Sequence, residues 1–272
     1  MMTMIACSIS VFQKSGLAAL AMAVILATPA AAHASVTAPS ACPEVKLPVV
    51  EVPHLRAALA RQLPAIIVAL GSSSTQSWMA SDAAHSYPAV LQDALSRLLP
   101  HAHIAVINRG IGGQDAAEEL GRLDKDVVAV RPQLVIWQVG ANGVLHATDP
   151  AVFSKLVERG IAHLHQSGED VVLMDNQEAP RILASREHGA IEASLAQVAD
   201  QTDASLFSRT NLMDEWAQAG APYSRFISAD QLHHNDLGYR CLGEAVASAI
   251  ASAVKLGPSP AASPPVVSSL TP

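Results

Sequence analysis

Apolar residues along this chain alternate between short unbroken runs and stretches with helical spacing. The unbroken runs are rich in Ile, Val and Leu, which is typical of strands buried on both faces of a parallel sheet, and they lie at 66–70, 104–107, 134–137, 171–174 and 205–207. Helical spacing is found at 86–99, about 115–130, 150–166, 187–201 and in a last helix that includes Leu242 and Ile250. Strand and helix therefore alternate some five times. This order predicts a central parallel sheet covered by helices on both faces.

The two ends of the chain do not share this pattern. Lys14, an apolar segment at 17–27 and the small residues around Ala32-His33-Ala34 predict a secretory signal peptide over 1–34, and hence an exported, periplasmic or extracellular protein. Residues 35–64 contain five prolines and predict an extended arm with a short helix before the first strand. Residues 65–256 form the predicted α/β domain, and 257–272 a disordered Pro/Ser-rich tail.

Composition limits the class of partner. The formal charge is −7, and an acidic domain argues against nucleic acid or an anionic membrane surface as the main partner. No segment approaches 18 uninterrupted apolar residues, so no stable membrane insertion is expected. Two cysteines, Cys42 and Cys241, remain after removal of the signal, and in an oxidising compartment we expect them to pair and pin the arm to the last helix. The oligomeric state is not predicted.

Small and polar residues follow the first three strands. Three serines, including Ser73, follow the first strand, Gly112-Gly113 the second and Asn142 the third. Because the carboxyl ends of parallel strands meet at one edge of the sheet, we expect Ser73, Gly113 and Asn142 to converge there. A serine hydroxyl is a candidate nucleophile, and glycine N–H groups with an Asn amide are donors suited to an oxyanion. The alternative is a serine-rich turn that only caps the next helix.

A second constellation precedes the last helix. In Asp230-x-x-His233, a carboxylate three residues before a histidine can reach the imidazole Nδ1 and leave Nε2 facing a serine. The alternative is a polar helix start in which Asn235 or Asp236 is the N-cap.

Taken together, these residues resemble the SGNH hydrolases, also called the GDSL esterase/lipase family. The resemblance rests on four blocks in the expected order: Gly71-Ser72-Ser73, Asn108-x-Gly110-x-x-Gly113, Gly140-Ala141-Asn142 and Asp230-x-x-His233. It implies a flavodoxin-like three-layer α/β/α fold and a hydrolase domain over 65–256. It further implies Ser73 as nucleophile, His233 as base and Asp230 as the acid that orients it. The oxyanion hole would consist of Gly113, Asn142 and the Ser73 N–H, without cofactor or metal.

Two positions depart from the family pattern. Ser72 replaces the aspartate before the nucleophile, and Gly143 replaces an aspartate after the third block. Because those carboxylates would hydrogen-bond neighbouring loops, their loss raises the question of loop rigidity. We expect Ser72 to hydrogen-bond a neighbouring loop instead, and only Ser73 to act as nucleophile.

The interpretation is an exported serine esterase that acts on carboxylic esters. Its substrate would be a small-molecule or glycan ester, with acetyl or short acyl groups on carbohydrate, or a lysophospholipid. The alternatives are a non-hydrolytic carbohydrate- or envelope-binding module and an acyltransferase on the same fold. A dinucleotide fingerprint at Gly110-x-Gly112 has Asp115 in place of its third glycine and is weaker. The pairs His101-x-His103 and His163-x-His165 have no further ligands at metal-binding spacing.

Overall fold

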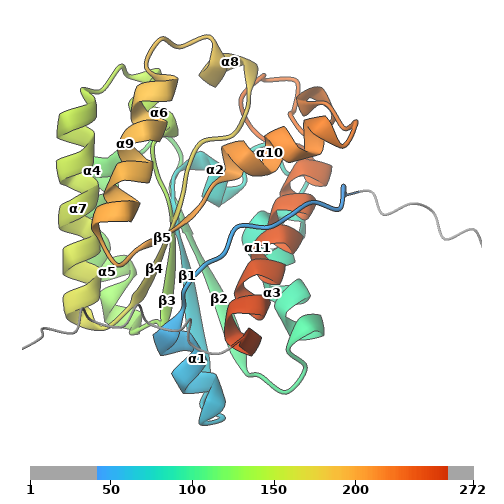
Figure 1. Ribbon diagram of the computed structural model, residues 1–272. Helices are drawn as coiled ribbons and strands as arrows, with labels where there is room; N and C mark the ends of the chain where they lie inside the picture. Colours follow the sequence, from blue (N-terminus) through green and yellow to red (C-terminus); the bar gives the residue numbers. More distant parts are fainter. Residues whose placement is uncertain (1–41, 257–272) are drawn as a thin grey trace, which may run out of the picture. The chain divides into compact units, whose positions relative to one another are not determined.

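A computed structural model describes residues 42–256 of the chain, so the predicted signal peptide, the first part of the arm and the tail lie outside the described residues. Five parallel strands form one sheet in the order β2-β1-β3-β4-β5 (Figure 1). The strands are β1 (Ala65–Gly71), β2 (Ile104–Gly110), β3 (Leu134–Gln138), β4 (Asp170–Met174) and β5 (Ser205–Phe207). All five predicted strands are present, and the expected α/β/α fold class is confirmed.

The alternation of side chains along β1 explains why both faces of the sheet are covered. Ile67 and Ala69 belong to one apolar cluster, and Val68 and Leu70 to the other, because successive side chains of a strand point to opposite faces. The first cluster is closed by α1 (Pro53–Ala60), α3 (Tyr87–Leu98) and α11 (Asp236–Leu256). The second is closed by α7 (Pro150–Ser167), α9 (His188–Gln201), α4 (Ala116–Leu120) and α5 (Leu123–Asp126), and Figure 1 shows the two layers on either side of the strands.

The prediction of a single helix over about 115–130 is wrong. The structure has α4, then α5, then a 3-10 turn η2 (Val128–Val130). The interruption falls at Gly121, a poor helix former, and it turns Arg122 back toward the sheet. There the guanidinium donates to the carbonyl oxygens of Arg109 (2.8 Å) and Gly71 (2.9 Å), at the ends of β2 and β1. A continuous helix would lose these bonds.

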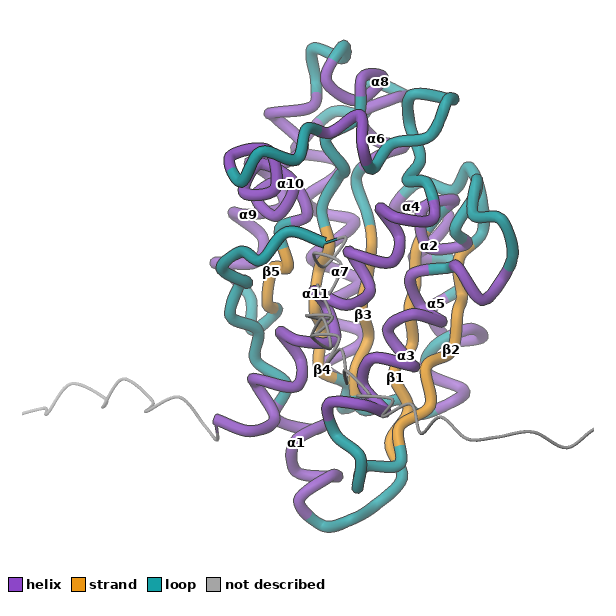
Figure 2. Tube along the Cα trace, turned by 90° about the vertical axis from the view of Figure 1, so that its right-hand side faces the viewer, coloured by secondary structure: helices purple, strands orange, loops and turns teal. Residues whose placement is uncertain are grey.

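Short helices gather where the strands end. They are α2 (Ser73–Gln76), α6 (Ala141–Leu145), α8 (Pro180–Leu183), η1 (Ala83–His85) and η3 (Tyr223–Arg225). Figure 2 shows α2, α6 and α8 at the carboxyl end of the strands and α1 at the opposite end. The sequence pattern also missed α10 (Arg209–Gln218), which is polar overall and is anchored at its start by Asp175, whose carboxylate accepts from Ser208 Oγ (2.7 Å). Within 42–256, no helix is both long and apolar enough to span a membrane.

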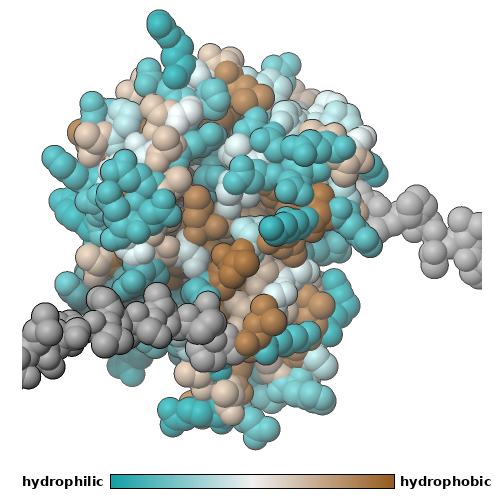
Figure 3. Space-filling view, viewed as in Figure 1, coloured by the Kyte–Doolittle hydropathy of each residue, from teal (hydrophilic) through white to brown (hydrophobic). Residues whose placement is uncertain are grey.

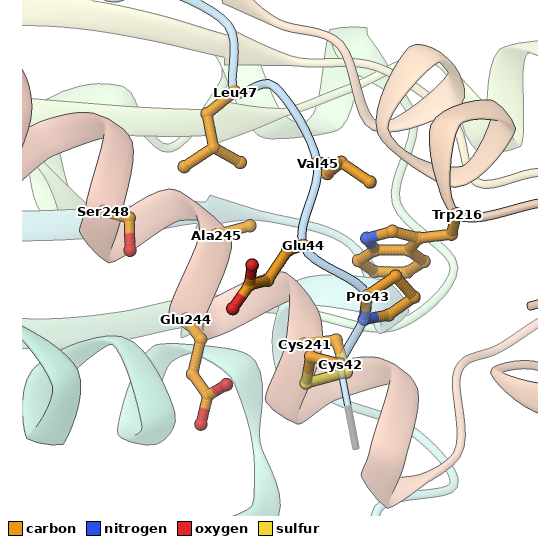
Figure 4. Close-up of a pocket in the computed structure, with 10 residues that line it drawn as sticks. All are labelled: Cys42, Pro43, Glu44, Val45, Leu47, Trp216, Cys241, Glu244, Ala245 and Ser248. Atoms are coloured by element: carbon orange, nitrogen blue, oxygen red, sulfur yellow. A yellow bond between two sulfur atoms is a disulfide. The ribbon is translucent and has the colours of Figure 1, made fainter. Parts of the chain in front are cut away.

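The arm is more deeply packed than its proline content led us to expect. Val50 and Val52 are buried in the first apolar cluster, and the Glu51 N–H donates to Ser205 Oγ of β5 (2.8 Å). Cys42 is joined to Cys241 of α11 by a disulfide (Figure 4). On the face seen in Figure 3, hydrophilic residues cover most of the surface and apolar residues gather near its middle, where the arm crosses.

Candidate active site

Ser73 is placed by the abrupt end of β1. The strand ends at Gly71, whose φ of +156° and whose close approach to Thr75 Oγ1 and the Gln138 carbonyl leave no room for a Cβ. Ser73 is then the first residue of α2. Its Oγ lies 2.7 Å from His233 Nε2. The residue that opens α2 and a residue 160 positions later in the sequence therefore meet at the carboxyl edge of the sheet.

A tight turn before α11 carries His233 and Asp230. One Asp230 oxygen accepts from the N–H groups of Leu232 and His233, both at 3.0 Å, and from Ser228 Oγ at 2.7 Å. The other lies 2.5 Å from His233 Nδ1. Burial alone would raise the pKa of Asp230, but these hydrogen bonds outweigh it and hold that pKa well below its usual range. The carboxylate is therefore ionised and accepts from Nδ1–H, which leaves Nε2 as an acceptor for the Ser73 hydroxyl.

The alternative expected for this turn, a polar helix start, is also present in the structure. Asn235 Oδ1 accepts from the Gly238 N–H (2.9 Å), as an N-cap residue does, and α11 begins at Asp236. The cap and the Asp230–His233 pair use different residues of one turn, so the two descriptions do not compete.

The donors expected for an oxyanion line the same cleft, which has a volume of about 420 Å³. Gly113 has φ +82°, and no described heavy atom lies within 4 Å of where its Cβ would stand, so its backbone faces open space. Asn142 Nδ2 donates to the Gln114 carbonyl (2.7 Å), which fixes the amide. Its second N–H has no other protein partner among residues 42–256. The structure thus brings Ser73, Gly113 and Asn142 together, as the strand-end argument expected.

The second block is held against α2 by close backbone contact. A Cβ on Gly110 would stand 2.0 Å from the Gln76 nitrogen, so only glycine fits there. Asn108 Nδ2 donates to the Thr75 carbonyl (2.9 Å), and its Oδ1 accepts from the Gly110 N–H (2.9 Å). These bonds fix the loop that carries Gly113 relative to Ser73.

The two departures from the family pattern have different structural consequences. Ser72 is buried, and both its N–H and its Oγ lie 3.3 Å from Gln138 Oε1 at the end of β3. Gly143 lies in an apolar environment, where a Cβ would meet Phe153 and Ile191 at ordinary contact distances of 3.7 and 3.8 Å. Ser72 thus has a polar partner in Gln138, whereas Gly143 is packed against the apolar side chains of Phe153 and Ile191.

Several residues of the site were not predicted from the sequence. Gln177, after β4, donates through Nε2 to the Leu232 carbonyl (2.7 Å), next to His233. Trp78 lines the cleft, is 54% exposed and stacks toward the His233 ring with centroids 6.4 Å apart. Arg181 of α8 lines it as well. Gln177 stands in an all-polar run directly after a buried strand, so the strand-end rule could have found it, whereas Trp78 and Arg181 carry no such signal.

The candidate metal-ligating histidines do not form a site. His163 pairs with Asp124, and His101 and His103 are exposed. Over the described part of the chain, no group of three or more His, Cys, Asp or Glu residues is placed to hold a metal ion.

Comparison with known proteins identifies the family. The model of the non-GDSL lipase-like family matches residues 38–256. The chain belongs to this family. The resemblance to the SGNH/GDSL esterases and lipases is thereby confirmed. The chain is also similar to an arylesterase from Vibrio mimicus, with 33% identity over 96 residues, which is 35% of this chain and 46% of that protein.

Solved structures share the fold. A two-domain esterase (CEX) active on acetylated mannans matches with a TM-score of 0.63 and 20% identity, over 76% of this chain and 55% of that one. The acetyl xylan esterase AlAXEase matches with a TM-score of 0.58 and 22% identity, over 68% of this chain and 99% of that one. The match thus spans only about half the length of the arylesterase and of the two-domain esterase.

Proposed function

We propose that this protein is a serine esterase that hydrolyses carboxylic esters through an acyl-enzyme. The observation that carries the proposal is the continuous hydrogen-bonded chain from Ser73 Oγ through His233 to the ionised Asp230. Membership of a lipase-like family and similarity to an arylesterase support the same reaction class.

The geometry orders the steps of the reaction. Ser73 Oγ attacks the ester carbonyl carbon while its proton passes to His233 Nε2, and Asp230 stabilises the imidazolium that forms. The carbonyl oxygen becomes an oxyanion that accepts from the N–H groups of Ser73 and Gly113 and from the Asn142 amide. Collapse of the intermediate breaks the ester C–O bond, and the imidazolium protonates the departing alcohol. Water then attacks the acyl-enzyme, gives a proton to Nε2, and releases the acid and free Ser73.

The substrate would carry a short acyl group, such as acetyl, on a carbohydrate or small alcohol. Two features support this: the cleft is small and open, and the exposed face of Trp78 lies beside the triad, where a flat sugar or aryl ring can stack. Esterases that act on acetylated mannans and acetyl xylan share the fold. A lysophospholipid remains the alternative substrate, and a longer acyl chain would have to extend beyond the cleft.

Export is part of the proposal. Residues 1–34 have the pattern of a signal peptide, and the disulfide between Cys42 and Cys241 is a bond that persists in oxidising compartments. Recovery of a protein beginning at Ser35 outside the cytoplasm would support export. An intact N-terminus on the cytoplasmic protein would contradict it.

The three adjacent serines offer a matched test of the nucleophile. Ser72 and Ser74 are buried and directed at Gln138 and Gln177, whereas Ser73 faces His233. We expect Ser73→Ala to lower kcat for 4-nitrophenyl acetate by ~10³-fold or more with unchanged circular dichroism, and Ser72→Ala and Ser74→Ala to cost far less. A fluorophosphonate should label Ser73 alone, and an adduct on Ser72 or Ser74 would show that the nucleophile is wrongly assigned.

The same preparation distinguishes the alternative functions. A binding module would show neither turnover nor labelling at Ser73. An acyltransferase would label, but in the presence of a sugar alcohol it would release acylated alcohol faster than free acid. We expect free acid as the main product.

A further inference from the structure

The lining of the active-site cleft has a charge opposite to that of the chain as a whole. None of the ten residues that line the cleft is Asp or Glu, although the chain carries a formal charge of −7. Two basic residues outside the triad, Arg181 and His146, are exposed on the cleft wall. The carboxylate beside His233, that of Asp230, is already engaged by His233 and by its own turn. The cleft therefore presents a permanent positive charge that no carboxylate of its lining balances.

The backbone of Arg181 is fixed, whereas its guanidinium has no partner within the described residues. Pro180 starts α8, and the Arg181 N–H donates to the Gln231 carbonyl (3.1 Å), two residues before His233. The side chain makes no ion pair or hydrogen bond with any residue in 42–256. By contrast, Arg122 and Arg209 hold backbone carbonyls with theirs. Arg181 thus has donors to offer to a ligand rather than to the fold.

We propose that the substrate ester carries an anionic group, a carboxylate or a phosphate, and that Arg181 binds it during the reaction. The inference rests on the proposed esterase function and names its substrate class. Arginine presents paired N–H donors that match the two oxygens of a carboxylate or phosphate. A charge at the wall of a cleft acts through less water than one on an open surface, so its effect on a bound anion is larger.

Matched esters test this selectivity on the wild-type enzyme and on Arg181→Gln. Mono-4-nitrophenyl glutarate and 4-nitrophenyl valerate differ by a carboxylate on the acyl side. On the alcohol side, 4-acetoxybenzoate and 4-acetoxyphenyl phosphate carry the charge, and 4-acetamidophenyl acetate is neutral. We expect Arg181→Gln to lower kcat/KM by about tenfold for at least one anionic ester and by less than threefold for its neutral partner. The three charged probes show which side carries the anion and whether carboxylate or phosphate is preferred.

Arg186→Gln is the matched control, because Arg186 is exposed on the same segment but does not line the cleft. It should leave the ratio of anionic to neutral kcat/KM unchanged, and the wild-type ratio should fall as salt rises, since ions screen exposed charges. If Arg181→Gln leaves that ratio unchanged for all three anionic esters, the inference is wrong. Failure of the wild-type enzyme to turn over the neutral esters would instead overturn the esterase proposal, so the two failures are distinguishable.

Discussion

A buried glutamate gives a stability prediction with a definite sign. Glu119 of α4 is 1% exposed, and its Oε2 accepts from Trp137 Nε1 of β3 (2.8 Å). Burial raises the pKa of Glu119 to about 8, although the hydrogen bond from Trp137 and the charge of Arg122 partly oppose the rise. The folded protein therefore holds a proton on Glu119 at pH values where the unfolded chain has lost it.

The linkage between protonation and folding fixes the size of the effect. Because the folded state binds the extra proton, the free energy of unfolding falls as pH rises from the unfolded pKa of 4.5 to the folded value of about 8. With these two pKa values, the ionisation of Glu119 lowers the free energy of unfolding, relative to its value at low pH, by about 1 kcal/mol at pH 5, about 3 kcal/mol at pH 7 and about 4 to 5 kcal/mol at pH 9. Glutamine has the shape of the protonated acid and keeps an acceptor for Trp137, but it cannot ionise.

Glu119→Gln should therefore be more stable than the wild type, by an amount that grows with pH. The measurement is urea unfolding of the oxidised proteins at pH 5, 7 and 9, with the free energy taken from the transition midpoint at an unchanged slope. Glu44→Gln is the control, because Glu44 is exposed and makes the same change of charge. Parallel pH curves for the wild type and Glu119→Gln would refute the reasoning, since they would mean that Glu119 ionises in the folded protein as it does in the unfolded chain.

Three further variants test the packing. Replacing both Cys42 and Cys241 by Ser opens a loop of 199 residues, and we expect the free energy of unfolding to fall by up to ~5 kcal/mol, measured as a lower urea midpoint than that of the non-reduced wild type. A midpoint equal to the wild type would show that the packed arm needs no cross-link. Gly160→Ala would place a Cβ 2.3 Å from the Trp137 ring and should cost about 1 to 3 kcal/mol. The same change at Gly189, where no described atom lies within 4 Å, should stabilise α9 by up to about 1 kcal/mol, and equal effects at both sites in thermal melts would contradict the packing argument.

The sequence predicts best what depends on local pattern. The apolar runs identify the strands because a parallel sheet buried on both faces tolerates no polar side chain in its centre, and β5 was placed at its observed bounds. The helix predicted over 86–99 from its spacing is α3, and the structure adds Ser86 as its N-cap. The strand-end rule also brought Ser73, Gly113 and Asn142 to one cleft, because it depends only on the direction of the strands.

Features that depend on contacts distant in sequence were not predictable from it. The break at Gly121 follows from what Arg122 gains by reaching the carbonyls of β1 and β2, and apolar spacing contains no record of that bond. Helix α10 has little apolar spacing, and its start is fixed by Asp175 of the loop after β4. The environment of Gly143 likewise depends on Phe153 and Ile191, which reach it only in the folded chain.

The segment after β4, which includes α8, connects the turn of the proposed triad to the selectivity proposed for the cleft. Gln231, within the Asp230–His233 turn, has φ +61°, a conformation that is unfavourable for any residue but glycine. Its carbonyl accepts from the Arg181 N–H, and the next carbonyl, of Leu232, accepts from Gln177 Nε2. Two donors from the segment 177–181 therefore hold consecutive carbonyls of the turn that presents His233. Because the segment 177–181 also carries the Arg181 guanidinium, which has no partner within residues 42–256, a backbone rearrangement that moves Arg181 from the cleft also releases the carbonyls that hold the turn of the proposed base. For that reason, selectivity and catalytic geometry should change together when this segment is exchanged. Replacing only the Arg181 side chain should change selectivity alone.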